Sequence, residues 1–568
     1  MRKLLSGLLA ISLAMCLLAP AAGAAETSFR DVPANSALAA EVEKAVDYGL
    51  MNGYSPDTFG YGDTMTRAQF VTVVGRMLPE DLRGASVAIS HVGPAMAVPN
   101  TKEMASFFPS IEQAARMGWV DSTVPFRPSD PITRGEMAEI LVRALGLGSA
   151  ADQIASGGSY GRLLGGTPFT DVSPENQGYI AIAYSIGMTN GTSNTTFSPD
   201  NTATRAQVAA MLVRVYERMN QPTDCVHGFY AISSYSQLDL AGDMDMVSAG
   251  WSRMTWDGET ALLSTTSANG NEYAIPSGYK EVTDSLSSRD VPLHLSVFMD
   301  GKDLKSLLAS DAGRAQAVEQ IVGELTVDYR AIGRNPYSGV TIDFEGLRSA
   351  QRADFTAFLT ELDQELEALD KALYVCVSPI LAEGYDQSYS GYDYAAIGDL
   401  ADKLILMAYD YDTRDMRDFV GSTYYRTAAT APIDQVYLGL KILTGRVDAD
   451  KVLLGFSSKC TAWQIDGEGN LVSGTPVYPS VETVVKRLAQ ANTEAGWSNT
   501  YQQPYAIYTT EDGSRYFLWY QDSQSVQSAL RVAKLLGVNG VSLWRLGTIP
   551  VYSFGDIRDW SWTCLFQE

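Results

Sequence analysis

The chain has 568 residues, and its 42 Lys and Arg against 66 Asp and Glu give a formal net charge of −24 at pH 7. Hydrophobic residues make up 46% of the sequence, which predicts several globular domains rather than a disordered chain. The acidic charge disfavours nucleic acid and anionic membranes as partners. The three His residues are far apart, which excludes His-Glu-x-x-His zinc sites, and we expect neither a metal nor a cofactor.

Residues 1–24 have the pattern of a secretory signal peptide. Arg2 and Lys3 precede an apolar run over 4–18, and the small residues Ala22-Gly23-Ala24 provide a cleavage site. The run is shorter than the ~20 residues that span a membrane. A membrane anchor and a lipid anchor on Cys16 are the alternatives. We therefore predict a secreted protein that has no membrane contact after cleavage.

The other four of the five cysteines are widely spread. They are Cys225, Cys376, Cys460 and Cys564. This spacing is unlike the dense disulfide frameworks of small secreted domains. Cys376 lies in an apolar run, so we interpret it as a core residue.

Three degenerate repeats occupy the first part of the chain. Each contains a Thr-Arg-(Ala/Gly)-(Gln/Glu) motif, at 66–69, 133–136 and 204–207. Thr is a favourable N-cap, and an apolar helical face follows each motif. A helix-like stretch that ends in a Gly turn precedes each motif. Each unit is therefore expected to be a pair of helices, and the three pairs must pack together to bury their apolar faces.

These motifs resemble the surface-layer homology (SLH) repeat, over about residues 27–218. The expected repeats are 27–80, 90–148 and 167–218. The resemblance implies an all-α bundle that binds pyruvylated, and so anionic, secondary cell-wall polysaccharide at the bacterial cell wall or S-layer surface. The second repeat departs from the pattern, since Ala97 stands where the opening Asp would be. An unrelated helical repeat is the alternative. The polysaccharide-binding residues implied by the family are Arg67, Arg134, Arg205, Gly53 and Gly191.

From residue 225 to 568, short apolar runs alternate with helical patterns. Eight such runs in this length predict a (β/α)8 barrel. Between the fourth and fifth runs, apolar residues from Phe355 to Leu369 recur at helical spacing, which predicts a helix packed on the barrel. The interval of about 456–536 is too long for one helix and predicts a small α+β insertion. The expected strands are Val226–Ile232, Met246–Trp251, Leu293–Met299, Gly339–Phe344, Leu373–Val377, Lys403–Met407, Val452–Gly455 and Gly540–Leu543.

The strongest chemical signal follows the fourth predicted strand. With a side-chain period of two, Thr341, Asp343 and Glu345 point into the barrel. Two carboxylates at the carboxyl end of a barrel strand lie where barrel enzymes carry their active sites. Repulsion and partial burial raise one pKa and produce a general acid. The alternative is a structural pair bridged to Arg or Lys.

Two other strand ends add polar and aromatic groups. Met407-Ala408-Tyr409-Asp410 follows the sixth strand, and Trp544 follows the eighth. A phenol and a carboxylate can orient an amide, and an indole can form an apolar floor under a sugar ring. Barrel packing is the alternative for each.

Together these motifs resemble family 18 glycoside hydrolases over about residues 225–560, in particular the bacterial branch that includes spore-cortex N-acetylglucosaminidases. The resemblance implies substrate-assisted cleavage of β-1,4 bonds next to N-acetylglucosamine in peptidoglycan or chitin-like glycans. Glu345 is then the acid, Asp343 and Tyr409 hold the acetamido group, and no metal is needed. The substrate-binding residues are Asp410, Met407, Trp544 and Thr341.

Two carboxylates of the family signature are missing, since Ser338 and Thr341 stand where it has Asp. Thr341 is expected to donate a hydrogen bond to Asp343. The competing hypothesis is a catalytically silent barrel that binds glycans or serves as a surface-layer component, because a fold resemblance does not guarantee chemistry.

Overall fold

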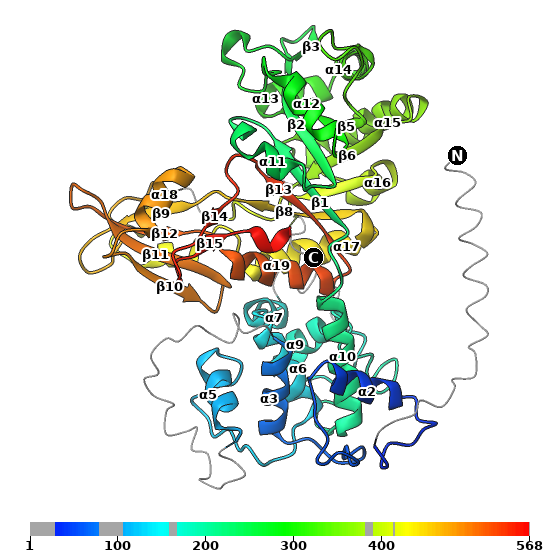
Figure 1. Ribbon diagram of the computed structural model, residues 1–568, viewed down its shortest axis with the longest axis vertical. Coiled ribbons are helices and arrows are strands. Elements are labelled where there is room, and N and C mark those ends of the chain that lie inside the picture. The colour runs from blue at the N-terminus through cyan, green and yellow to red at the C-terminus, as the bar shows by residue number, and fades with distance from the viewer. Residues whose placement is uncertain (1–28, 79–105, 158–166, 381–389, 413–414, 567–568) are drawn as a thin grey trace.

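A computed structural model describes residues 29–78, 106–157, 167–380, 390–412 and 415–566 (Figure 1). The predicted signal peptide over 1–24 and the opening of the second repeat at Ala97 lie outside the described residues. Figure 1 shows a helical bundle joined by one helix to a barrel, from which a smaller β-rich unit projects. Within the described residues, no helix is both long and apolar enough to cross a membrane.

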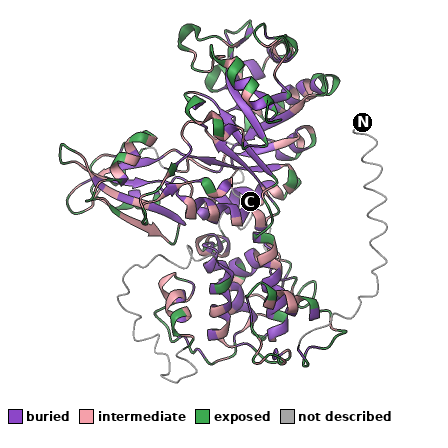
Figure 2. Ribbon diagram, in the orientation of Figure 1, coloured by how far each residue is buried: buried purple, intermediate pink, exposed green. Residues whose placement is uncertain are grey.

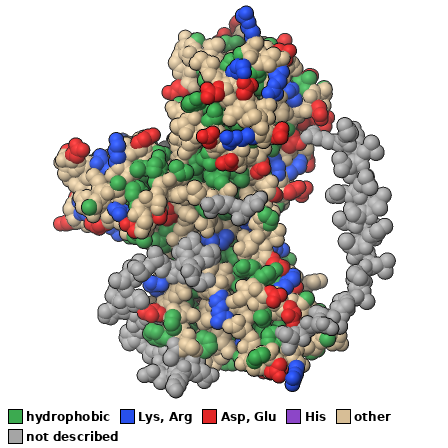
Figure 3. All heavy atoms as spheres, in the orientation of Figure 1, with side chains coloured by type: hydrophobic (Ala, Val, Ile, Leu, Met, Phe, Trp, Pro, Cys, Tyr) green, Lys and Arg blue, Asp and Glu red, His purple; other side chains and the backbone are tan. Residues whose placement is uncertain are grey.

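The N-terminal bundle is all-α, as the sequence predicts. Its buried side chains form one apolar core along the helices (Figure 2). On the face shown in Figure 3, acidic and basic side chains are interspersed over the bundle and the barrel. The helices are α2 (Ala39–Asp47), α3 (Arg67–Met77), α5 (Phe108–Arg116), α6 (Arg134–Ala144), α7 (Gly148–Ala155), α9 (Pro174–Ser185) and α10 (Arg205–Met219).

The three repeats interlock at the starts of α3, α6 and α10. Each helix has its predicted Thr N-cap, and each cap forms a capping box with the third helical residue. The first backbone N–H of each helix donates to a carbonyl of another repeat, so the contacts run in a cycle: Arg67 to Asp130, Arg134 to Asn201, and Arg205 to Asp63. This cycle gives the bundle threefold pseudosymmetry.

All eight predicted barrel strands are present and parallel. The sheet closes because β1 pairs with both β13 and β2. Six strand boundaries differ from the prediction by one or two residues. Strand β2 extends to Trp256, where it pairs with an unpredicted antiparallel strand, β3 (Ala261–Ser264). The barrel strands are β1 (Cys225–Tyr230), β2 (Met246–Trp256), β4 (Leu293–Met299), β5 (Gly339–Phe344), β6 (Ala372–Val377), β7 (Lys403–Leu406), β8 (Val452–Ser457) and β13 (Gly540–Trp544).

Helices cover the outside of the barrel. On α15 the predicted apolar stripe from Phe355 to Leu366 is buried, and Phe358 stacks on Phe344 of β5 with ring centroids 5.2 Å apart. Leu369 lies just beyond the helix and is exposed, contrary to the prediction. The covering helices are α11 (Leu238–Ala241), α12 (Tyr279–Ser287), α13 (Gly301–Leu308), α14 (Asp311–Thr326), α15 (Arg352–Ala368), α16 (Tyr394–Leu400), α17 (Ile433–Thr444) and α19 (Ser523–Leu535).

A small α+β unit lies between β8 and α19. Its four antiparallel strands have the order β10-β11-β12-β9. We call residues 461–519 the insertion. The elements are β9 (Thr461–Ile465), α18 (Val481–Leu488), β10 (Glu494–Ser498), β11 (Gln503–Thr509) and β12 (Arg515–Trp519).

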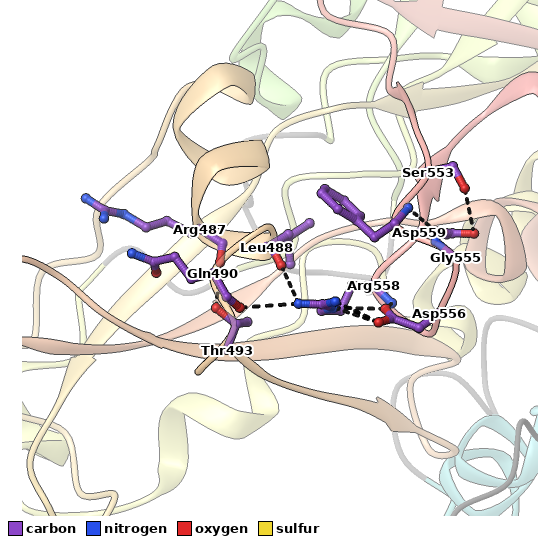
Figure 4. Close-up of polar contacts among 10 residues, drawn as sticks. Arg487, Leu488, Gln490, Thr493, Ser553, Gly555, Asp556, Arg558 and Asp559 are labelled. Carbon is purple, nitrogen blue, oxygen red and sulfur yellow. Dashed lines mark hydrogen bonds and ion pairs between the residues drawn. The ribbon is translucent and has the colours of Figure 1, made fainter.

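The C-terminal segment fastens the insertion to the barrel. It carries the hairpin of β14 (Val551–Tyr552) and β15 (Trp560–Ser561). Arg558 donates to the carbonyls of Leu488 and Gln490 at the end of α18, and it pairs with Asp556 (Figure 4). The indole of Trp560 donates to the carbonyl of Gln521 at 2.8 Å.

Bundle and barrel are in direct contact. Helix α7 packs on α17, where the buried carboxylate of Asp434 accepts hydrogen bonds from Gln153 at 2.7 Å and Ser149 at 3.1 Å. The hydroxyls of Ser185 and Tyr437 lie 2.8 Å apart. These contacts tie the barrel to the bundle at points besides the connecting chain.

The barrel interior contains a chain of neutral polar groups. The ring of His227 contacts Ser542 at 2.7 Å and Ser248 at 2.8 Å, and Ser248 contacts Thr341 at 2.7 Å. His294 contacts Thr341 at 3.3 Å. Burial lowers the pKa of each His to about 3, so both imidazoles are neutral at pH 7.

This burial predicts acid-sensitive stability. A His with a pKa of about 6.5 when unfolded and a lower one when folded contributes stability that is complete above about pH 6.5 and is lost as pH falls toward 3. Between pH 4 and pH 6, the free energy of unfolding of the barrel should change less steeply with pH in His294→Gln than in wild type. The difference in slope is at most about 1.4 kcal/mol per pH unit, the value for one titrating group. Denaturant unfolding across this range measures it, and equal slopes would contradict the account.

Candidate active site

Strand β5 carries the two carboxylates in the predicted orientation. Val340, Ile342 and Phe344 belong to the core between strand and helices, whereas Thr341 and Asp343 contact groups inside the barrel. Asp343 is 4% exposed, and Glu345, at the mouth, is only partly buried. The backbone N–H of Glu345 donates to the carbonyl of Met299 at 2.9 Å, which fixes the strand end against β4.

Asp343 is a buried carboxyl group with a weak partner. Among the residues that the structure describes, none hydrogen-bonds to its Oδ1 atom, and its side chain bonds to the thiol of Cys376 on β6. Burial, followed by repulsion from Glu345, raises the pKa of Asp343 well above its ordinary value. Cys376 is buried as predicted, but its contact with Asp343 was not expected; its inward position on β6 was the available signal.

Tyr409 lies beside the carboxylates, after β7. Burial is the main cause of its raised pKa, and charges on Asp343 and Glu345 contribute. Its ring fits against Gly455 on β8, where a Cβ atom would come within 3.0 Å of Tyr409 Cε1. Gly455 is not among the predicted site residues, although only a glycine leaves this space.

Trp544 and Met407 line the upper barrel. Both pack on the cluster of interior side chains that includes Phe229 and Cys376. The rings of Phe229 and Trp544 meet edge to face at 5.1 Å. Asp410, in contrast, forms an ion pair with Lys459 at 3.2 Å.

Thr341 does not form the expected hydrogen bond to Asp343. It is fully buried, and its hydroxyl contacts Ser248 and His294 instead. The Thr341 hydroxyl therefore belongs to the network of neutral groups on β1, β2 and β4 inside the barrel. Ser338 bonds to the carbonyl of Leu293 at the opposite, amino end of β5.

A cavity of about 350 Å³ lies to one side of the carboxylates. Tyr230, Trp251 and Glu272 are among its lining residues. The neighbouring Tyr273 stacks on Phe298 at 4.9 Å, and its pKa of about 12 results from burial and then from the charges of Asp343 and Glu345. Tyr273 therefore places an aromatic surface next to the site, which the sequence analysis did not predict.

The bundle residues implicated in polysaccharide binding are more buried than expected. Arg134 and Arg205 are 9% and 5% exposed, and they donate to the carbonyls of Phe197 and Phe59 in loops of neighbouring repeats. Arg67 donates to the carbonyl of Phe126 and pairs with Glu136. The three side chains therefore hold the repeats together, because the loops fold over the helix starts.

Gly53 and Gly191 leave room for aromatic side chains that pack against their loops. A Cβ atom at Gly53 would approach Phe29 within 2.5 Å, and one at Gly191 would approach Phe169 within 2.4 Å. Gly191 has a φ of 80°. In the described parts of the chain, no three His, Cys, Asp or Glu side chains gather as metal ligands would.

The raised pKa of Asp343 predicts how Asp343→Asn changes stability. A carboxyl group with a raised folded-state pKa contributes stability below its unfolded pKa of about 3.9 and loses it as pH rises. We expect Asp343→Asn to unfold at a higher temperature than wild type, by a margin that grows from pH 4 to pH 8. Thermal melts of both proteins test this, and a margin that shrinks with pH would contradict it.

Two family models match the chain. "Glycosyl hydrolases family 18" matches residues 213–548, and "S-layer homology domain" matches 28–71, 101–138 and 168–209. The chain is 24% identical over 229 residues to the cortical fragment-lytic enzyme of Bacillus subtilis (strain 168), which is 40% of this chain and 50% of that protein. It thus spans about half the length of this relative.

The solved structures that match the chain include the chitinase of Chromobacterium violaceum ATCC 12472, at 21% identity and a TM-score of 0.47, covering 60% of this chain and 98% of that one. The Bacillus megaterium QM B1551 spore cortex-lytic enzyme SleL has 17% identity and a TM-score of 0.46, covering 68% and 80%. Because the family 18 model covers more than half of the residues, the chain belongs to the glycosyl hydrolases of family 18, and three S-layer homology domains precede its barrel.

Proposed function

We propose that the barrel cleaves β-1,4 bonds next to N-acetylglucosamine by substrate-assisted catalysis. The observation that carries this proposal is the pair on β5, with Asp343 buried and Glu345 at the mouth, beside Tyr409. Family 18 membership supports the reaction class.

The position of the two carboxylates argues against an enzyme nucleophile. The two-carboxylate mechanisms need groups on opposite sides of the scissile bond. Asp343 lies in β5 and Glu345 directly follows its end, so the two carboxylates are two residues apart on one extended segment and project toward the same side. Asp410, the carboxylate that follows Tyr409, forms an ion pair with Lys459. The acetamido oxygen of the substrate is then the group that attacks the anomeric carbon.

Each residue has a role that fits its surroundings. Glu345, at the accessible mouth, protonates the glycosidic oxygen as the bond breaks and later removes a proton from the attacking water. Asp343 accepts the acetamido N–H on Oδ1, to which no group in the described parts of the chain is hydrogen-bonded, and this contact aligns the acetamido oxygen. The Tyr409 hydroxyl, protonated because its pKa is raised, donates to the same acetamido group. Trp544 provides the apolar floor.

The bundle supports peptidoglycan as the substrate. S-layer homology domains would hold the barrel on the cell wall, where peptidoglycan is the abundant N-acetylated glycan. Oligomers of N-acetylglucosamine are the matching soluble probe.

One observation favours a second candidate, a catalytically silent glycan-binding or surface-layer protein. The barrel floor beneath Asp343 is neutral, because Thr341 stands where the family signature has Asp and bonds to Ser248 and His294. A silent barrel keeps its affinity for N-acetylated glycans without cleaving them.

Glu345→Gln separates the two candidates. We expect this variant to bind N-acetylglucosamine oligomers normally but to release products about 10²- to 10⁴-fold more slowly, since it lacks the general acid. Mass spectrometry of products from purified peptidoglycan and from the oligomers measures release. Glu367→Gln, at an exposed position on α15, is the control and should match wild type. Equal release by wild type and Glu345→Gln, or none by either with glycan still bound, would reject the proposed enzyme.

We further propose that the three S-layer homology domains bind secondary cell-wall polysaccharide through its negative charges. The helix starts at Arg67, Arg134 and Arg205 provide N-terminal dipoles and guanidinium groups. Signal-peptide cleavage would deliver the protein to the cell surface.

Anchoring is tested with the intact protein, since Ala at the three Arg positions would also weaken the repeats. We expect the protein to sediment with purified walls and to be released when mild acid strips pyruvyl groups from the polysaccharide, because the anionic ligand is lost. Arg30→Ala, a substitution at an exposed side chain, should sediment like wild type. Unchanged sedimentation after acid treatment would contradict the proposal.

A further inference from the structure

The loop that carries Tyr409 is hydrogen-bonded to the insertion. Beyond Asp412 this loop pairs through its backbone with residues that follow β9. The N–H of Met416 donates to the carbonyl of Gly474 at 2.7 Å, and the N–H of Leu471 donates to the carbonyl of Ser422 at 2.8 Å. At Gly474 a Cβ atom would come within 2.3 Å of the Arg417 backbone nitrogen, so the two segments touch main chain to main chain.

A cluster of charged side chains joins the same two segments beside the active site. Lys459, between β8 and β9, lies 3.2 Å from Asp410 and 3.3 Å from Asp412. Its ammonium group lies 4.4 Å from the ring centroid of Tyr478, and the Tyr478 hydroxyl donates to Asp412 at 3.3 Å. We call these four residues the Lys459 clasp.

The burial of Asp412 makes Lys459 necessary. The Asp412 side chain has no exposed surface, whereas that of Lys459 is 23% exposed. A buried carboxylate without its counter-charge is strongly unfavourable, so removal of the ammonium group forces Asp412 to move toward water or to bind a proton. Either outcome disturbs the chain from Asp410 to Asp412.

Tyr409 directly precedes Asp410. Asp410 has a φ of 62°, a left-handed conformation that a non-glycine residue adopts only when its surroundings hold it there. Lys459 provides such a restraint, through the ion pair at 3.2 Å. Because the Tyr409 ring lies against Gly455, a change at Asp410 shifts the phenol in the site.

We propose that Lys459, which precedes the insertion and contacts Tyr478 within it, is a positioning residue that holds Asp410 and thereby aims the Tyr409 hydroxyl at the substrate's acetamido group. The inference rests on the proposed function and deepens it, because it assigns the insertion a part in catalysis. Asp410 is then a link in the clasp rather than a sugar ligand.

Kinetics of three variants test the proposal. We expect Lys459→Met to lower kcat on N-acetylglucosamine oligomers about ten- to a hundredfold, with a smaller change in KM, since small misplacements of catalytic groups cost rates of this size. Lys459→Arg keeps the charge and should recover most of the rate. Lys486→Met removes an exposed lysine from α18 in the insertion and should match wild type. A full rate in Lys459→Met, or an equal loss in Lys459→Arg, would overturn the proposal.

A double variant tests whether Lys459 and Asp412 act together. If they do, Lys459→Met/Asp412→Asn should lose less activity than the product of the losses in the two single variants, because contacting residues are coupled. Strictly multiplicative losses would contradict a shared clasp.

Backbone hydrogen exchange tests, independently of activity, whether the Lys459 clasp restrains the segment that carries Tyr409. We expect Lys459→Met to exchange faster than wild type in peptides covering residues 403–412, with no change in β5. If exchange in the peptides covering 403–412 is the same in Lys459→Met as in wild type, the proposal is overturned, whether or not wild type is active. If wild type releases no product, the proposed function fails, and faster exchange in this segment would still support the clasp.

Discussion

A buried carboxyl group with an unsatisfied oxygen is the constraint around which the barrel is arranged. Asp343 lies inside the barrel, and the Cys376 thiol is too weak a donor to offset the loss of water. Such a group destabilises the free protein. In the proposed function it becomes satisfied when the substrate brings its acetamido N–H to Oδ1, which would make the same atom a binding determinant for N-acetylated sugars.

The surroundings of Asp343 divide into two layers. Below it, His227, Ser248 and Thr341 form a neutral, hydrogen-bonded floor that adds no counter-charge. Above it, Glu345 and Tyr409 come from the ends of β5 and β7, where substrate can reach them. Burial and then repulsion from Glu345 raise the pKa of Asp343, and the Lys459 clasp fixes the upper layer from the side of the insertion. The bundle joins the barrel at α7, far along the chain from either layer.

Local patterns predicted the strands and the carboxylate pair well. Alternation along β5 places Asp343 and Glu345 correctly because strand geometry has a strict period of two. Local patterns could not predict contacts between segments that are distant in the sequence. Thr341 bonds to Ser248 and His294 because barrel closure brings three strands together, and Lys459 finds Asp412 only after the loops fold. Arg134 and Arg205 are buried by loops of neighbouring repeats, a relation that one repeat's sequence does not contain.

The central claim is that Asp343 and Tyr409 receive the acetamido group of the sugar. A crystal structure of Glu345→Gln with a bound N-acetylglucosamine oligomer tests it most directly. The account predicts the acetamido nitrogen within hydrogen-bond distance of Asp343 Oδ1, and the acetamido oxygen next to the Tyr409 hydroxyl and below the anomeric carbon. An oligomer bound with its acetamido group directed to solvent, or bound away from β5, would contradict it.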